Sequence, residues 1–181
     1  ICPAQWAVLC NFHIVRGAES ACAFASALTL DTGRRIESWH LPISKTDPQA
    51  CGCVRSWGCV CSASSSCPYH AALELLGTLH EKFAVDGVLP ADLPLFPCAD
   101  GSWCSKAGFV DTLHYMANRI GLSTVDSMGR NIIGEHIWRV SGSRFLAAID
   151  VPTPIIMRLA RWESSVVLRY IADAPLSALT R

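Results

Sequence analysis

The chain has 181 residues, 51% of them hydrophobic, which is enough to bury a core and excludes an intrinsically disordered protein. Its 15 basic and 15 acidic residues cancel, which argues against a strongly basic nucleic-acid-binding protein. No run of about 18 apolar residues exists, so we expect no membrane-spanning helix. Six arginines against three acids between residues 130 and 169 nevertheless predict a local basic surface.

The N-terminal part of the chain predicts two helices followed by a β-hairpin. Apolar residues recur at helical spacing before Arg16, and a shorter helix is expected through Glu19. Strands are predicted at residues 27–31 and 36–44, on either side of a turn. Pro42 marks the second strand as an edge strand, because proline has no N–H to donate to a neighbouring strand.

A cysteine-rich segment follows the hairpin, with five of the ten cysteines between residues 51 and 67. Two Cys-x-Cys pairs followed by Cys-x-x-His are typical of a tetrahedral zinc site. Six side chains compete for four ligand positions, and the favoured set is Cys53, Cys61, Cys67 and His70, with Cys51 and Cys59 as alternates. No position is left for an activating water, so we expect a structural site that orders an insert at residues 50–70. The alternatives are reduced free thiols or a disulfide-rich extracellular domain.

The rest of the chain predicts helices separated by polar loops. Helices are expected at residues 71–85, 105–120, 136–149, 153–161 and 166–172. Ser105 is expected to cap the second of these helices, Thr153 the fourth, and Ser164 or Ser165 the last. Together with the hairpin, these helices predict a mainly α protein with a small β-hairpin or sheet, which is an α+β fold.

Several polar residues stand where they could form a phosphate site. His136 and Arg139 are three residues apart on a predicted helix, so their side chains share one face and can clamp a phosphate. Tyr170 lies on the last predicted helix, and a tyrosine hydroxyl beside such a clamp can act as a nucleophile. Each residue also has a simpler interpretation, as a solvated surface charge or as an aromatic side chain that packs in the core.

In chain order, these residues resemble the catalytic domain of the tyrosine recombinases, the phage-integrase family. The order is Arg-x-x-Glu on a helix, a hairpin that ends in Lys-Thr, then His-x-x-Arg, Arg-Trp and Tyr. The resemblance covers nearly the whole chain apart from the cysteine-rich insert. The Arg-Trp-x-Ser and Arg-Tyr-Ile forms are similar to the branch found in eukaryotic mobile elements. The resemblance implies one catalytic domain at residues 1–181 that contains the Cys/His-rich insert at residues 50–70. Because the family's N-terminal DNA-clamping domain is absent, we expect a fragment of a longer protein.

The resemblance implies catalytic roles for Arg16, Lys45, His136, Arg139, Trp162 and Tyr170. The two arginines would neutralise a phosphate, Tyr170 would attack it, and Lys45 would protonate the leaving oxygen. Glu19 would support the first arginine. The sequence departs from the family pattern in several places. Tyr170 follows Trp162 by eight residues where many members have nine, Ala160 replaces a common glycine, and Val140-Ser141 replaces the His-Thr or similar pair that often follows the second arginine.

The activity that the resemblance implies is DNA strand transfer. Such an enzyme cuts and rejoins DNA through a 3′-phosphotyrosine intermediate, in the recombination or integration of a mobile element, and needs no cofactor for its chemistry. The implied partners are double-stranded DNA and further copies of the chain, as a tetramer on paired sites. We expect an intracellular protein, nuclear if its source is eukaryotic. The alternative is a catalytically inactive, zinc-stabilised remnant that binds DNA or protein.

Overall fold

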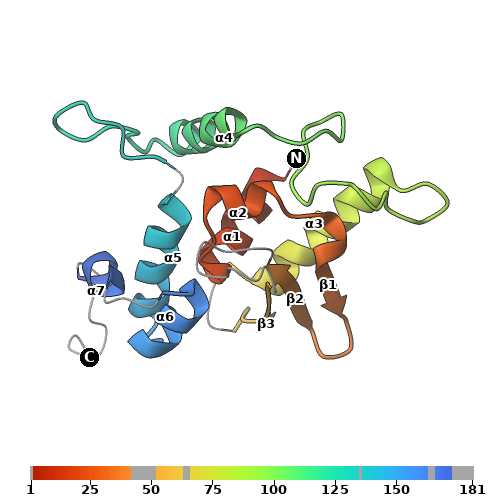
Figure 1. The fold of residues 1–181 in the computed structure, drawn as a ribbon, viewed down its shortest axis with the longest axis horizontal. Coiled ribbons are helices and arrows are strands. Elements are labelled where there is room, and N and C mark those ends of the chain that lie inside the picture. The colour runs from red at the N-terminus through yellow and green to blue at the C-terminus, as the bar shows by residue number, and fades with distance from the viewer. Residues whose placement is uncertain (1, 42–51, 63–65, 135, 163–165, 173–181) are drawn as a thin grey trace.

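The computed structural model of the chain describes residues 2–41, 52–62, 66–134, 136–162 and 166–172 (Figure 1). It confirms the predicted α+β class. The elements in order are α1 (Pro3–His13), α2 (Gly17–Ala21), the 3-10 helix η1 (Ala25–Ala27), β1 (Leu28–Asp31), β2 (Ile36–Leu41), β3 (Cys53–Gly58), α3 (Pro68–Phe83), α4 (Lys106–Arg119), α5 (Ile137–Ala148), α6 (Thr153–Ala160) and α7 (Val166–Ile171).

The sheet has three antiparallel strands in the order β1-β2-β3, one strand more than the predicted hairpin. Leu28 of β1 pairs with Trp39 of β2, and Leu41 of β2 pairs with Cys53 of β3. The prediction that β2 is an edge strand is therefore wrong. The strand ends at Leu41, and Pro42 lies outside the described residues.

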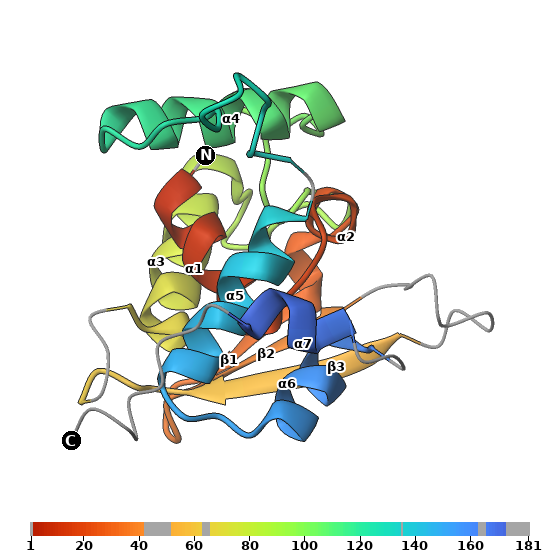
Figure 2. The ribbon, with the colours of Figure 1, turned by 90° about the vertical axis from the view of Figure 1, so that its left-hand side faces the viewer.

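Helix α1 is the centre of the main core. It packs between α3 and α5, and Figure 2 shows these helices on one side of the sheet, with α4 lying across their far end. The Trp6 ring of α1 lies 5.0 Å from the Phe109 ring of α4 and 5.1 Å from the Trp138 ring of α5. Because α1 is covered on several sides, its apolar residues are not confined to one stripe.

A buried polar contact joins α1 to the sheet. His13 Nε2 lies 2.8 Å from Glu37 Oε1, and both side chains are fully buried. The Trp39 ring packs edge-on against the His13 ring, with 5.1 Å between the ring centroids. A buried polar pair of this kind adds directional contacts to a core that is otherwise apolar.

Helix α5 sits close against α1 because a glycine faces the contact. A Cβ atom at Gly142 would collide with the backbone oxygen of Asn11. The Asn11 side-chain oxygen accepts a hydrogen bond from Ser141 Oγ at 2.6 Å. These contacts fix the position of α5 along α1, and with it the position of Arg139.

A second, smaller core holds the C-terminal helices. It consists of buried Ile14, Leu146, Ile156, Ala160 and Val167, with Trp162 and Ile171 packed against it. It joins α6 and α7 to α5. The turn after α6 lies near α2, where Arg161 contacts Glu19. This arrangement brings together residues from the two ends of the chain.

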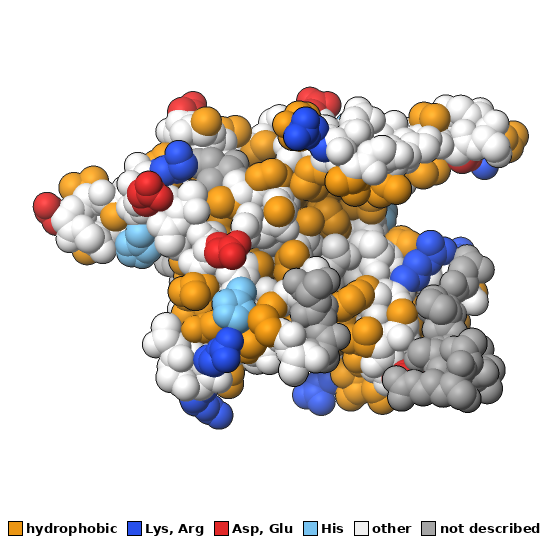
Figure 3. Space-filling model, turned by 180° about the vertical axis from the view of Figure 1, so that it is seen from behind, with side chains coloured by type: hydrophobic (Ala, Val, Ile, Leu, Met, Phe, Trp, Pro, Cys, Tyr) orange, Lys and Arg blue, Asp and Glu red, His pale blue; other side chains and the backbone are white. Residues whose placement is uncertain are grey.

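The surface of the described residues carries charges of both signs. On the face opposite to that of Figure 1, Lys, Arg, Asp and Glu side chains are scattered, and apolar side chains gather beneath α4 (Figure 3). None of the helices in the described part of the chain is long and apolar enough to cross a membrane.

Candidate active site

The candidate site is built around the carboxylate of Glu19, near the start of α2. The backbone N–H of Arg16, which precedes the helix, donates to Glu19 Oε2 at 2.7 Å. The glutamate is only 6% exposed. This helix-capping arrangement orients the carboxylate and fixes the backbone from which the Arg16 side chain extends.

Arg139 reaches the same carboxylate from α5. Its Nη2 donates to Glu19 Oε1 at 3.2 Å and to Oε2 at 3.4 Å, and the residue is 3% exposed. Burial lowers the pKa of the Arg139 guanidinium from its ordinary value, the Glu19 carboxylate opposes this shift, and the positive charges of Arg16 and Arg161 add to it. A guanidinium remains charged under such a shift, so the site is a dense group of positive charges.

Arg161 is the third arginine of the group, and it comes from the turn after α6. Its Nη2 lies 3.0 Å from Glu19 Oε1, and its side chain is 13% exposed. The guanidinium groups of Arg139 and Arg161 thus contact one carboxylate, the charge of Arg16 also acts on Arg139, and the local charge stays positive. Within the described residues, the Nε atoms of Arg16 and Arg139 are buried without a hydrogen-bond partner. These two donors could bind an anion that enters the site.

Two aromatic residues extend this group toward the last helix. The Arg139 guanidinium carbon lies 5.7 Å from the centre of the Trp162 ring, within cation–π range. The centres of the Trp162 and Tyr170 rings are 5.2 Å apart. Arg144 Nε donates to the backbone oxygen of Tyr170 at 3.0 Å, which ties α7 to α5. We refer to Arg16, Glu19, Arg139, Arg161, Trp162 and Tyr170 as the Glu19 cluster.

One predicted site residue, His136, stands apart from this group. His136 is the residue before α5, and its side chain is exposed, whereas the Arg139 side chain is buried. The histidine lines a hollow of about 780 Å³ together with Ser141 and Arg144. Lys45 lies outside the residues that the structure describes. Of the seven residues considered, the structure brings Arg16, Glu19, Arg139, Trp162 and Tyr170 together.

Sequence reasoning assigned no role to Arg161. Its position directly before Trp162 is visible in the Arg-Trp motif, but nothing local in the sequence indicates an ion pair with Glu19, 142 residues upstream. The contact depends on how α6 packs against α5.

A second group of ionisable side chains lies between β3 and α3. Cys59, Cys61, Cys67 and His70 have ligand atoms within 4.8 Å of one another, and we call them the thiol cluster. Cys61 Sγ lies 3.0 Å from His70 Nδ1, and Cys59 Sγ lies 3.9 Å from it. The donor set could hold a metal ion.

The composition of this cluster differs in one member from the favoured ligand set. Cys59, named above as an alternate, takes the place of Cys53, which lies within β3 and pairs with Leu41. The other alternate, Cys51, lies outside the described residues. Each of the nine cysteines that the structure describes is a free thiol.

The environment of the thiol cluster favours one thiolate over the others. Burial acts to raise the pKa of Cys67, but backbone N–H groups of His70 and Val60 donate to its sulfur, and the net result is a pKa of about 6. A hydrogen bond with Cys59 is the main cause that raises the pKa of Cys61 to about 11. Cys67 caps α3, and amide groups at a helix start stabilise an anion.

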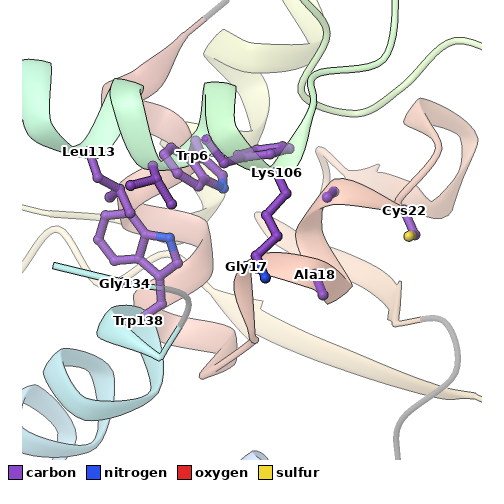
Figure 4. A pocket seen from close by; sticks show the side chains of 11 residues that line it. Trp6, Gly17, Ala18, Cys22, Lys106, Leu113, Gly134 and Trp138 are labelled. Carbon is purple, nitrogen blue, oxygen red and sulfur yellow. The ribbon is translucent and has the colours of Figure 1, made fainter.

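An apolar pocket of about 160 Å³ is lined in part by Gly17 and Ala18, which lie between Arg16 and Glu19 in the chain (Figure 4). Its lining residues come from α1, α2, α4, α5 and the segments beside them: Trp6, Gly17, Ala18, Ala21, Cys22, Lys106, Phe109, Val110, Leu113, Gly134 and Trp138. Lys106 extends from α4 toward Gly17 and is the only charged residue in this lining. A pocket without convergent polar groups offers no acid–base chemistry, so the Glu19 cluster is the better candidate for an active site.

The fold is shared with solved structures of DNA recombinases. No protein-family model matches the chain, and no curated protein is similar to it in sequence. The XerH site-specific recombinase bound to palindromic difH substrate has a TM-score of 0.68 at 16% identity, over 98% of this chain and 44% of that one. The Tn1549 transposon integrase in complex with circular intermediate DNA has a TM-score of 0.58 at 14% identity, over 97% of this chain and 55% of that one.

The fold resembles the catalytic domain of tyrosine recombinases. At these identities the likeness concerns the fold alone. The chain spans about half the length of each of these two structures.

Proposed function

We propose that the chain is a DNA strand-transferase domain that cuts and rejoins double-stranded DNA through a 3′-phosphotyrosine intermediate. The observation that carries this proposal is the Glu19 cluster, in which three arginines lie beside Trp162 and Tyr170. The shared fold with DNA-bound recombinases supports it. Residues 1–181 would form the catalytic domain, with residues 50–70 as an insert.

The charge of the cluster suits a phosphodiester under attack. As a nucleophile approaches phosphorus, negative charge grows on the non-bridging oxygens, and fixed donors in a water-poor site stabilise it strongly. Arg16 and Arg139 each have a buried Nε without a partner among the described residues, so both can donate to such oxygens. Glu19 holds part of the Arg139 guanidinium in place and keeps it charged.

The reaction then proceeds by exchange of one P–O bond for another. The Tyr170 oxygen bonds to phosphorus and loses its proton, and the bond from phosphorus to the 5′-oxygen breaks. In this proposal Lys45 gives a proton to that oxygen, and His136 helps to accept the tyrosine proton or to orient the phosphate. A 5′-hydroxyl from another strand reverses the step and rejoins the DNA. Trp162 supports Tyr170 through their ring contact.

The finer assignments rest on the motif pattern. The Arg-Trp and Arg-Tyr-Ile forms around residues 161 and 170 favour the branch of eukaryotic mobile elements, and so a role in DNA integration in the nucleus. Strand exchange between two DNA sites requires several active sites, which supports a homo-oligomer, with a tetramer on paired sites as the simplest form. These assignments concern the whole protein.

For the thiol cluster we propose a structural zinc ion held by Cys59, Cys61, Cys67 and His70. Three sulfurs and one imidazole nitrogen suit tetrahedral zinc, whose bonds to sulfur are about 2.3 Å long, and the four ligand atoms already lie within 4.8 Å of one another. Arg35 Nη2 lies 3.3 Å from His70 Nε2, which must accept there, because arginine has only donors. If zinc bound Nδ1, the imidazole proton would be on Nε2. Nε2 could then no longer accept a hydrogen bond from Arg35, and the exposed Arg35 side chain would turn away.

The test of the proposed activity uses nicked duplex oligonucleotides with a randomised core, which trap a covalent intermediate because the short cleaved strand diffuses away. Wild type should form a complex that survives denaturing electrophoresis, and Tyr170→Phe should form none because the nucleophilic oxygen is lost. Tyr115→Phe removes a hydroxyl from a 62% exposed tyrosine on α4 and should behave like wild type.

Two other outcomes would contradict this proposal. If Tyr170→Phe formed as much covalent complex as wild type, Tyr170 would not be the nucleophile. Salt-sensitive DNA binding without any covalent complex in wild type would instead support the inactive, DNA-binding remnant.

A further inference from the structure

Arg161 adopts a backbone conformation that favours glycine. It ends α6 with φ 56° and ψ 45°, in the left-handed region, and its N–H bonds to the carbonyl oxygens of Arg158 and Met157. Glycine is the usual residue at such a helix end, because a Cβ atom is disfavoured there. The conformation therefore gives no reason for an arginine at this position, and the reason must come from its side chain.

The side chain of Arg161 makes a buried contact with a distant element. Its Nη2 lies 3.0 Å from Glu19 Oε1, and the same oxygen accepts from Arg139 Nη2 at 3.2 Å. One carboxylate oxygen thus joins α2, α5 and the turn after α6. Because the Arg161 side chain is 13% exposed and Glu19 is 6% exposed, solvent screens this contact little.

The contact completes a closed ring of four residues. Glu19 pairs with Arg139, Arg139 lies against the Trp162 ring, Trp162 follows Arg161 in the chain, and Arg161 returns to Glu19. The Trp162 N–H also bonds to the Met157 carbonyl oxygen at 3.0 Å, which sets the direction of the chain as it leaves α6. The Trp162 ring in turn contacts the Tyr170 ring.

We infer that Arg161 is a positioning residue, which locks the turn after α6 to Glu19 and so holds Trp162 and Tyr170 in register with Arg139. The effect of Arg161 on catalysis, as distinct from its effect on structure, rests on the proposed function. A small displacement of an attacking group lowers the rate of a positioned reaction much more than it lowers binding. Arg161 should therefore control the rate of the chemical step, while DNA affinity depends on other residues.

The experiment compares Arg161→Gly with Asp86→Gly. Asp86 also has a left-handed backbone, with φ 51°, but it is exposed in the Val85–Val88 turn, so its replacement relieves the same kind of strain without loss of a buried ion pair. At saturating DNA, Arg161→Gly should form the covalent complex about 10- to 100-fold more slowly, a loss typical of a misplaced reacting group. Asp86→Gly should match wild type in rate, and both variants should keep wild-type DNA affinity.

Chemical rescue gives a readout that a general loss of stability would not produce. Millimolar guanidinium ion should restore part of the rate of Arg161→Gly, because the cation can occupy the space beside Glu19, whereas sodium should not. Arg161→Lys keeps the charge without the planar fork and should fall between wild type and glycine in rate.

A spectroscopic readout separates this inference from the proposed function. With ¹⁵N-labelled tryptophan, the indole signal of Trp162 is identified by its absence in Trp162→Phe. It should shift in Arg161→Gly and in Glu19→Gln, and stay in place in Asp86→Gly. If wild type forms no covalent complex, the proposed function fails, and this signal alone decides the role of Arg161.

Two results would overturn the inference. One is an Arg161→Gly variant with wild-type rate and an unshifted Trp162 signal. The other is an Arg161→Gly variant that binds DNA more weakly but reacts at an unchanged rate at saturating DNA. If the salt dependence of its DNA binding also fell by the amount expected for about one phosphate contact, Arg161 would be a direct phosphate contact.

Discussion

The Glu19 cluster and the thiol cluster are both groups of ionisable side chains, but they are assembled in opposite ways. The thiol cluster lies within twelve consecutive residues, 59–70, and stands at the surface between a strand and a helix. The Glu19 cluster draws on residues more than a hundred positions apart, and its arginine and glutamate at α5 and α2 are almost fully buried.

The difference shows what each cluster depends on. The residues of a local cluster stay close whenever their segment is ordered, so a bound metal can both form the site and hold the segment. The residues of a long-range cluster meet only if the whole core is correctly packed. Their buried charges destabilise the fold unless opposite charges compensate one another. The thiol cluster should thus respond to metal, and the Glu19 cluster to the loss of any one of its charges.

The largest effect is expected from Glu19→Gln. Arg139 and Arg161 would remain buried without a carboxylate, so the free energy of unfolding should fall by about 3–5 kcal/mol, as for other broken buried ion pairs. Chemical denaturation followed by tryptophan fluorescence measures this loss, with six tryptophans as probes.

Glu37→Gln is the matched control, since Glu37 is also a buried carboxyl group, in contact with His13. The variant weakens one hydrogen bond to His13 and leaves no arginine charge buried without a carboxylate, so a loss of about 1–3 kcal/mol is expected. Equal losses in the two variants would mean that the arginine charges do not depend on Glu19.

The fold class was predictable from the sequence, because helical spacing and strand alternation are local properties. β3 was missed because the cysteines in and around residues 53–58 suggested a metal-binding loop, although partly buried and exposed residues alternate along it. β3 also explains which cysteines form the thiol cluster. Cys53 lies within this strand and pairs with β2, whereas Cys59 follows the last residue of the strand and belongs to the cluster.

The Glu19 cluster was predictable only in part. The order of motifs suggested that Arg16, Arg139, Trp162 and Tyr170 would converge, and the structure does bring them together. Neither spacing nor composition indicates the contact of Arg161 with Glu19, since it needs a left-handed backbone at residue 161 and a particular packing of α6. The position of His136 just before α5 explains why it is exposed although it is only three residues from Arg139.

The next largest effect concerns the metal. Wild type and Cys53→Ser should each bind one zinc ion per chain, and Cys59→Ser should bind it much more weakly, as measured by titration against a zinc indicator. At free zinc 100-fold above the dissociation constant, the wild-type free energy of unfolding should rise by about 2.7 kcal/mol. Zinc binding that survives Cys59→Ser and is lost in Cys53→Ser would reverse the ligand assignment.

Hydrogen exchange extends this test to both clusters. Removal of zinc with a chelator should speed amide exchange in residues 53–70 and leave α5 protected, because α5 is held by the core and not by the metal. Faster exchange in α5 to the same degree would show that the two regions unfold together.

The smallest effect is expected at an exposed charge pair, which serves as a reference for both clusters. Arg130 Nε lies 2.7 Å from Asp126 Oδ2, and the arginine side chain is 71% exposed. Hydrogen bonds from the backbone N–H and the side chain of Arg130 lower the pKa of Asp126 from its ordinary value. The lowered pKa means that this carboxylate stabilises the fold above its unfolded pKa, and that the contribution is lost as the pH falls through its folded pKa.

Asp126→Asn should therefore change thermal stability slightly at neutral pH and not at all in strong acid. Arg130→Ala should be indistinguishable from wild type at high salt, because solvent and salt screen the pair. A salt-independent loss in Arg130→Ala would show that exposure does not weaken charge pairs in this protein, and the contrast between buried and exposed charges would fail.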